Sequence, residues 1–133
     1  MAITAKLRQL KITARKVRLV ADLVRYKSVN EAEAILRFTS KKASLPMLKL
    51  LRSAMATVKN TYKANPADFY LAKLTVDDGP MTERVFPRSR GRADKLQKRT
   101  SHITMVLESK AGAAKPAVKE AAKKPAKSVT NKK

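Results

Sequence analysis

Cysteine is absent from this sequence, and histidine occurs once. Without thiols the chain has neither a disulfide framework nor a thiolate metal site, and one imidazole is too few for a conventional zinc or haem site. We therefore expect no metal and no cofactor. Aromatic residues are also scarce, at 5% with no tryptophan, which argues against a protein that stacks successive unpaired bases on aromatic platforms.

Long apolar stretches are missing as well. No uncharged run approaches the ~20 residues that a membrane helix needs, and residues 1–8 lack the apolar run of a signal peptide. We therefore expect a cytoplasmic protein that does not act at a membrane. Catalysis is not expected either, because no motif places a nucleophile or a carboxylate pair around His102.

Positive charge is what the sequence has in excess. Lys plus Arg number 31 against 10 Asp plus Glu, so the formal net charge is +21 over 133 residues. A compact domain with this charge repels itself strongly, and a polyanion is the expected partner. Nucleic acid ranks first, because phosphates release condensed counterions when Lys and Arg neutralise them. A chain of this length supports one modest core, and hence one domain.

The composition changes near the end of the chain. From residue 109 onward, eight lysines stand against Glu120 alone in a segment rich in alanine and proline. This segment carries +7, which leaves +14 on residues 1–108. We predict an ordered nucleic-acid-binding domain over residues 1–108 and a disordered basic tail over residues 109–133, since the tail has too little apolar surface to join a core.

Three helices are predicted in the first half of the chain. Thr13 is a candidate N-cap for the first, and Ser28 with Glu31 forms a capping-box pattern at the start of the second. A third runs from Lys41 to about Tyr62. The apolar residues at helical spacing are Val17, Val20, Ala21 and Val24, then Ala32, Ile35 and Leu36, then Leu48, Leu51, Met55, Val58 and Tyr62. The basic residues Arg15, Lys16, Arg18 and Arg25 lie mostly off the core face of the first helix.

Two segments of the second half, residues 71–77 and 103–107, alternate between apolar and polar residues, as half-buried strands do. Joining their apolar faces pairs Val76 with Ile103, Leu74 with Met105 and Ala72 with Leu107, and puts the turn between Ser89 and Arg90. Residues 6–12 form a candidate edge strand. The prediction is an α+β fold, in which about three helices pack on a short antiparallel sheet and a long β-hairpin protrudes.

The predicted hairpin arm, residues 79–100, has little apolar alternation and much charge. Its basic residues are Arg84, Arg88, Arg90, Arg92, Lys95, Lys98 and Arg99, against Glu83 and Asp94. About ten residues per strand would project on the order of 30 Å beyond the body. Arginine outnumbers lysine here, and its planar guanidinium suits bidentate phosphate contacts. We interpret the arm as a nucleic-acid-binding element rather than a solubilising loop.

Several motifs in chain order carry a resemblance to a known family. They are Arg15-Lys-Val-Arg-Leu-Val-Ala-Asp22, Lys41-Lys-Ala43 with Ser53-Ala54, Val76-Asp-Asp-Gly-Pro80, Arg84-Val-Phe-Pro-Arg88-Ser-Arg-Gly-Arg92-Ala-Asp94 and Lys98-Arg-Thr-Ser-His-Ile-Thr104. Through them, residues 5–108 resemble the twenty-second large-subunit ribosomal protein family. The resemblance implies a structural constituent of the large ribosomal subunit, with a body on the subunit's outer surface and a hairpin that runs through rRNA to line the peptide exit tunnel.

The resemblance also implies partners and residues. The partners are large-subunit rRNA, which the family helps to assemble, neighbouring large-subunit ribosomal proteins, and the nascent polypeptide at the hairpin tip, without a membrane or a second copy of the chain. The implied rRNA contacts are Arg15, Lys16, Arg18, Arg25, Lys27, Lys41, Lys42, Arg84, Lys95, Lys98, Arg99, Thr100, Ser101 and His102. The implied tunnel-lining tip consists of Phe86, Pro87, Arg88, Ser89, Arg90, Gly91, Arg92 and Ala93.

Two positions depart from the family pattern, and one alternative function stays open. Thr13-Ala14 replaces the common Ser-Pro at the first helix, and Tyr26 replaces a common glycine after it. Because a left-handed conformation is costly for tyrosine, we expect a differently built turn there. The alternative is an architectural DNA-binding protein with a basic β-arm. Preference for folded rRNA or for duplex DNA at matched salt separates the two functions.

Overall fold

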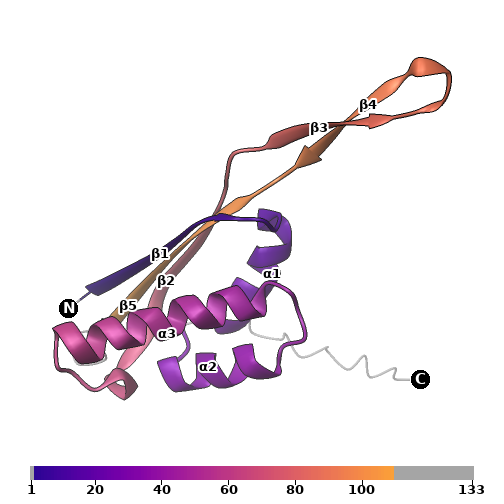
Figure 1. Cartoon of the computed structure of the whole chain (residues 1–133). Coiled ribbons are helices and arrows are strands. Elements are labelled where there is room, and N and C mark those ends of the chain that lie inside the picture. Colours follow the sequence, from indigo (N-terminus) through magenta and orange to yellow (C-terminus); the bar gives the residue numbers. More distant parts are fainter. Residues whose placement is uncertain (1, 110–133) are drawn as a thin grey trace, which may run out of the picture.

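The computed structural model describes residues 2–109, in which three α-helices and a short sheet form an α+β body (Figure 1). The elements in order are β1 (Ala2–Leu10), α1 (Ala14–Val24), α2 (Val29–Phe38), α3 (Ser44–Thr61), the 3-10 turn η1 (Pro66–Asp68), β2 (Phe69–Asp78), β3 (Thr82–Pro87), the 3-10 turn η2 (Ser89–Gly91), β4 (Ala93–Lys98) and β5 (Ser101–Ser109). The predicted fold class is confirmed. None of the helices within residues 2–109 is long and apolar enough to cross a membrane.

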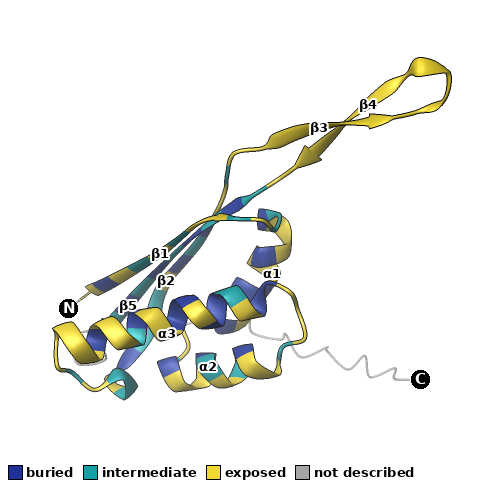
Figure 2. Ribbon diagram, in the orientation of Figure 1, coloured by how far each residue is buried: buried dark blue, intermediate teal, exposed yellow. Residues whose placement is uncertain are grey.

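The body sheet has three antiparallel strands in the order β1-β5-β2. Its central strand, β5, alternates strictly: Ile103, Met105 and Leu107 are buried, and the residues between them are partly exposed. The helix α1 packs against β2, α3 packs against β1, and α2 packs against α3. The core therefore lies between the helices and one face of the sheet, where Figure 2 shows the buried residues gathered.

The register of β2 on β5 matches the prediction near the arm and departs from it further away. The observed pairs Val76–Ile103 and Leu74–Met105 are those predicted. The third predicted pair is wrong, because a bulge between Leu71 and Lys73 places Leu71, not Ala72, opposite Leu107. The extra residue of the bulge lets the buried Leu71 stay on the core face while Ala72 is only partly buried.

The hairpin arm, β3 paired with β4, is a separate two-stranded sheet that projects away from the body (Figure 1). Its pairs, from Thr82–Lys98 to Pro87–Ala93, centre the turn on Arg90. The centre of the turn is therefore half a residue further along the chain than predicted. The cause lies at the root of the arm, where three residues, 79–81, stand opposite two, 99–100, so that the segment leading into β3 has one extra residue.

The third helix begins later than predicted and buries a slightly different face. It starts at Ser44, whose hydroxyl donates to the Leu36 carbonyl, and Pro46 lies in its first turn. Leu48, Leu51 and Val58 are buried as predicted. Met55 is only partly buried but packs against the core, and Tyr62 is 43% exposed, so the predicted place of Tyr62 in the core stripe is wrong. Met47 and Ala54, which lie outside the predicted stripe, are buried beside Leu51 and Val58.

The turn after α1 is left-handed at Tyr26, with φ 63°. The expectation of a different turn at this position is wrong. The Tyr26 N–H donates to the Leu71 carbonyl at 3.1 Å, and the Leu71 N–H donates to the Lys27 carbonyl at 3.0 Å. These two bonds fasten the turn to β2 and hold a conformation that costs a non-glycine residue about 1–2 kcal/mol.

The last strand of the body runs one residue past the predicted domain boundary. Ser109 is the last residue of β5 and pairs with Phe69 of β2. The predicted boundary after residue 108 therefore falls inside a strand. Residues 110–133, the rest of the predicted basic tail, lie outside the described residues.

Candidate nucleic-acid interface

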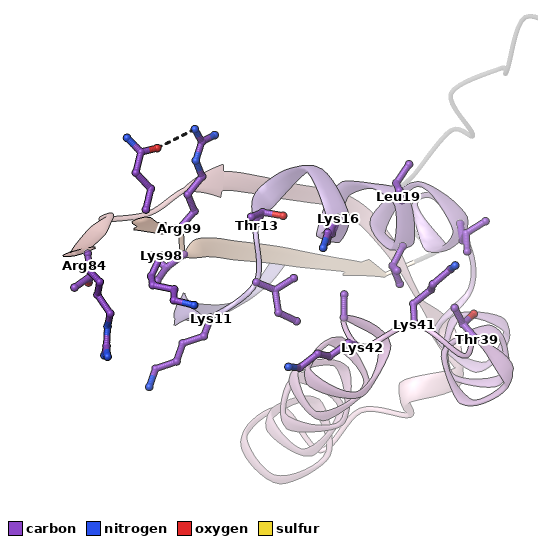
Figure 3. A pocket seen from close by; sticks show the side chains of 17 residues that line it. Lys11, Thr13, Lys16, Leu19, Thr39, Lys41, Lys42, Arg84, Lys98 and Arg99 are labelled. Carbon is purple, nitrogen blue, oxygen red and sulfur yellow. Dashed lines mark hydrogen bonds between the residues drawn. The ribbon is translucent and has the colours of Figure 1, made fainter. Parts of the chain in front are cut away.

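A groove of about 880 Å³ lies where the arm leaves the body (Figure 3). Its walls come from the segment before α1, one side of α1 as far as Leu23, the segment before α3 and the base of the β3–β4 arm. Seven of its 17 lining residues are basic: Lys11, Lys16, Lys41, Lys42, Arg84, Lys98 and Arg99. None of the 17, all within the described part of the chain, is acidic. Segments far apart in sequence thus build one cationic surface.

No acidic side chain of residues 2–109 pairs with the cations of this groove. In residues 2–109 none of the seven forms an ion pair, and Arg99 donates only to the Gln97 side-chain oxygen at 3.2 Å. Figure 3 shows the ammonium groups of Lys16, Lys42 and Lys98 projecting into the space between arm and helices. Unpaired like charges held close together repel one another, and a polyanion in the groove would relieve that repulsion.

Cations elsewhere on the body are arranged differently, as α2 and α3 show. Glu33 accepts hydrogen bonds from Arg37 at 2.8 Å and from Arg52 at 3.1 Å, which joins the two helices. Burial raises the pKa of Glu33, but the bonds from Arg52 and Arg37 outweigh burial and hold that pKa below its usual value. These two arginines are therefore paired with a carboxylate of the protein itself, unlike the cations of the groove.

The tip of the arm is held in shape by one of its own arginines. The Arg88 side chain forms an ion pair with Asp94 at 2.8 Å and lies over the Phe86 ring, 5.2 Å from its centroid. The turn itself uses positive φ at Arg90 and at Gly91, and only glycine adopts that conformation without steric cost. The predicted tip residues Phe86, Pro87, Arg88, Ser89, Arg90, Gly91, Arg92 and Ala93 are all exposed.

Comparison with known proteins identifies the group to which this architecture belongs. A family model described as ribosomal protein L22p/L17e matches residues 5–108. The chain belongs to the L22p/L17e family. The resemblance derived from the sequence motifs is thereby confirmed, and the protein is a structural ribosomal protein rather than an enzyme.

Curated relatives agree with the family match. The large ribosomal subunit proteins uL22 of Thermoanaerobacter sp. (strain X514) and Thermoanaerobacter pseudethanolicus are each 52% identical to this chain over 103 residues, covering 77% of this chain and 93% of the relative. The uL22 protein of Acetivibrio thermocellus is 48% identical over 104 residues, covering 78% and 83%. The similarity thus spans nearly the whole length of these family members.

The structure of this L22p/L17e protein brings together half of the predicted rRNA contacts. Those in the groove are Lys16, Lys41, Lys42, Arg84, Lys98, Arg99 and Thr100. Sequence reasoning missed Lys11 and the apolar lining residues Leu19 and Leu23. The sequence did contain a signal for the two leucines, because apolar residues four positions apart on α1 and outside its core stripe indicate a second apolar surface.

Arg18 and Arg25, two further predicted contacts, lie along the outer edge of β2. Arg18 Nε donates to the Val76 carbonyl at 3.1 Å, and Arg25 Nη2 donates to the Leu74 carbonyl at 3.3 Å. Arg18 also pairs with an Asp78 oxygen at 3.6 Å. An uncovered strand edge invites pairing with other chains. In this family member both arginines therefore protect the sheet edge, and their contact with rRNA stays a prediction.

The remaining predicted contacts are dispersed. Arg15 and Lys27 are exposed outside the groove, and Lys95 pairs with Glu83 at 3.5 Å. His102 Nδ1 accepts a hydrogen bond from the Gln9 backbone N–H at 3.0 Å. The Ser101 side chain is 0% exposed, and its contact with rRNA stays a prediction. Strand alternation places it on the same inward face as Ile103, where Oγ finds no hydrogen-bond partner among the described residues.

A close crossing of strands fixes the root of the arm. The Gly79 N–H donates to the Thr100 carbonyl at 2.9 Å, and Thr100 Oγ1 donates to the Pro80 carbonyl at 2.8 Å. A Cβ on Gly79 would lie 2.5 Å from Thr100 Oγ1. A larger residue would displace the Thr100 side chain and its bond to Pro80, so Gly79 helps set the direction in which the arm leaves the body.

Proposed function

We propose that this protein binds large-subunit rRNA as a structural constituent of the large ribosomal subunit in the cytoplasm, where it also aids assembly. In this proposal the body and the groove bind rRNA, and neighbouring large-subunit ribosomal proteins contact other parts of the body surface. The arm runs through rRNA and lines the peptide exit tunnel, with the nascent polypeptide passing its tip. The strong positive charge disfavours association with a second copy of the chain.

The exposure of the whole arm is the observation that carries this proposal. Every residue from 80 to 99 is exposed, including the large apolar side chains Val85, Phe86 and Leu96 (Figure 2). An isolated two-stranded ribbon is at best marginally stable in water. An arm of this composition is therefore expected to be fully ordered only when a partner surrounds it, and its arginines suit the phosphates of folded RNA.

The cationic groove is a second observation that supports rRNA binding. Its unpaired cations lie at the root of the arm, on the surface that the arm and the body share. A phosphate backbone crossing this surface would touch both parts at once. Body and arm would then be fixed relative to one another in the particle by the same RNA segment, which suits a protein that helps rRNA to fold.

The choice between rRNA and DNA can be tested with the free protein. We expect it to bind folded fragments of large-subunit rRNA about tenfold or more tightly than duplex DNA of equal length at the same salt concentration, because the groove and arm fit a folded shape. Fluorescence anisotropy with labelled RNA and DNA measures this ratio. Equal or tighter binding of the duplex, accompanied by DNA bending, would favour the architectural DNA-binding alternative.

Tunnel lining predicts a separate effect at the tip. Deleting residues 88–90 should leave the body fold and most rRNA affinity unchanged, because the groove cations and the proximal arm remain. Ribosomes carrying the deletion should have a wider or reshaped tunnel at the level of the tip. A structure of those particles would show the wall directly. If the variant protein never enters the large subunit, the tip is an anchor and this division of the arm is wrong.

A further inference from the structure

One wall of the cationic groove is apolar. Leu19 and Leu23 of α1 line it although they are 67% and 49% exposed, and Ile12 lies nearby in the same lining. Single exposed leucines are common on proteins. Here, however, two exposed leucines lie one helical turn apart in a groove whose other walls are basic. A ligand that fits this surface therefore offers both negative charge and an apolar face.

Charge decides which class of ligand fits. Of the described residues that line the groove, none is acidic and seven are unpaired cations. A lipid tail or an apolar peptide carries no negative charge to pair with these cations. RNA offers phosphates for the cations and flat base faces for the leucines. The volume, about 880 Å³, also falls within the range of about 300–1,000 Å³ typical of pockets that hold small organic groups.

The base must be unpaired to reach the leucines. In an A-form duplex the bases are stacked, and their faces are hidden from side chains. A nucleotide that is bulged or looped out exposes both faces of its base, which can then pack on apolar or guanidinium surfaces. Thr39, Gln97 and Thr100, in the same lining, offer polar groups to the edge of such a base.

The helix ends beside the groove add to its positive potential. Neither α1 nor α3 has a side-chain cap or an acidic residue in its first turn, whereas α2 is capped by Ser28 and Glu31. Thr13 and Ala43, the N-cap residues of α1 and α3, both line the groove. Partial positive charge at helix N-termini favours phosphate, so the helix ends reinforce the lysines and arginines.

We propose that the groove binds one unpaired nucleotide of RNA, with its phosphates on the basic rim and its base packed on Leu19 and Leu23. The proposal rests on the proposed function, because the ligand is RNA. It adds that the site distinguishes a flipped-out nucleotide from a paired one. Recognition of this kind would fix the position of the body on rRNA more closely than phosphate contacts alone, which carry no sequence information directly.

Two RNA hairpins that differ by a single bulged nucleotide provide the test. The whole protein should bind the bulged hairpin about tenfold more tightly than the fully paired one, because the bulged base removes apolar surface of Leu19 and Leu23 from water. A 2-aminopurine placed at the bulge should change its fluorescence on binding. Binding is measured by anisotropy at one salt concentration.

Three variants assign the effect to the apolar wall. Leu19→Ser and Leu23→Ser should each reduce the preference for the bulged hairpin severalfold while leaving affinity for the paired hairpin nearly unchanged. Leu45→Ser is the matched control, because Leu45 is also an exposed helical leucine, at 61%, but lies outside the groove. Circular dichroism checks that each variant keeps the parent fold, and Leu19, the more exposed of the pair, provides a variant that leaves the core intact.

Two results would overturn the inference while leaving the proposed function in place. One is equal affinity of the parent protein for the two hairpins. The other is a bulge preference that survives Leu19→Ser and Leu23→Ser, or that falls equally with Leu45→Ser. Failure of the proposed function is a different result, in which duplex DNA binds as tightly as both RNA hairpins.

Discussion

Leu51→Asp should unfold the free body at room temperature. Leu51 is fully buried at the centre of α3, in line with Met47 and Val58, and faces the core that the helices share with the sheet. A carboxylate there has no partner, and burying it costs several kcal/mol, which is comparable to the whole stability of a small domain. Loss of the folded circular-dichroism signal, measured against the parent, checks the prediction.

Met55→Asp is the matched control for this change. Met55 lies one turn further along the same helix but is only partly buried, so a carboxylate there keeps contact with water. We expect a lower melting temperature and a folded protein. Should Met55→Asp unfold the body as completely as Leu51→Asp, the stripe predicted from the sequence, which contains both residues, would describe the buried face of α3 better than the face described here.

Local signals in the sequence were enough to predict the helices. The capping box at Ser28 and Glu31 is present, with the Glu31 N–H donating to Ser28 Oγ at 3.4 Å. The core residues predicted for α1 are all buried. Both features depend on residues three or four positions apart, so the chain needs no tertiary partner to specify them. The strand register near the arm was equally well specified, because a slip would expose one apolar face.

Features set by tertiary contacts could not be predicted. The bulge between Leu71 and Lys73 lies where β2 pairs with β5 on one side and Leu71 bonds to the turn at Tyr26 on the other. The left-handed Tyr26 is held by that same contact with a strand far along the chain. No pattern of neighbouring residues carries this information, since an isolated tyrosine avoids the conformation.

The candidate site, like the fold, could be predicted only in part from local sequence. The sequence marks the basic residues, but it does not distinguish cations that are engaged within the protein from cations that are free. Arg18 and Lys16 stand two residues apart on α1, yet Arg18 binds the edge of β2 and Lys16 lines the groove unpaired. Only the packing of α1 against the sheet decides which direction each side chain takes.

Replacing three groove lysines should weaken rRNA binding more than any other surface change that preserves the fold. In the variant Lys16→Gln, Lys42→Gln and Lys98→Gln, each substitution removes one unpaired cation from a different wall of the groove. We expect affinity for an rRNA fragment to fall on the order of 100-fold at about 0.1 M salt, because three charge-assisted contacts are lost together. All three side chains are exposed, so the melting temperature should not fall.

Salt dependence separates a specific site from a loss of total charge. The control variant Lys49→Gln, Lys59→Gln and Lys63→Gln removes the same charge from exposed positions outside the groove. For the groove variant, the slope of log affinity against log salt should become shallower by about 2, at roughly 0.7 per lost phosphate contact. The control should keep a slope close to that of the parent, because its lysines face solvent rather than RNA. Equal losses in the two variants would mean that the protein holds RNA through its overall charge, and that the groove at the root of the arm has no special part in binding.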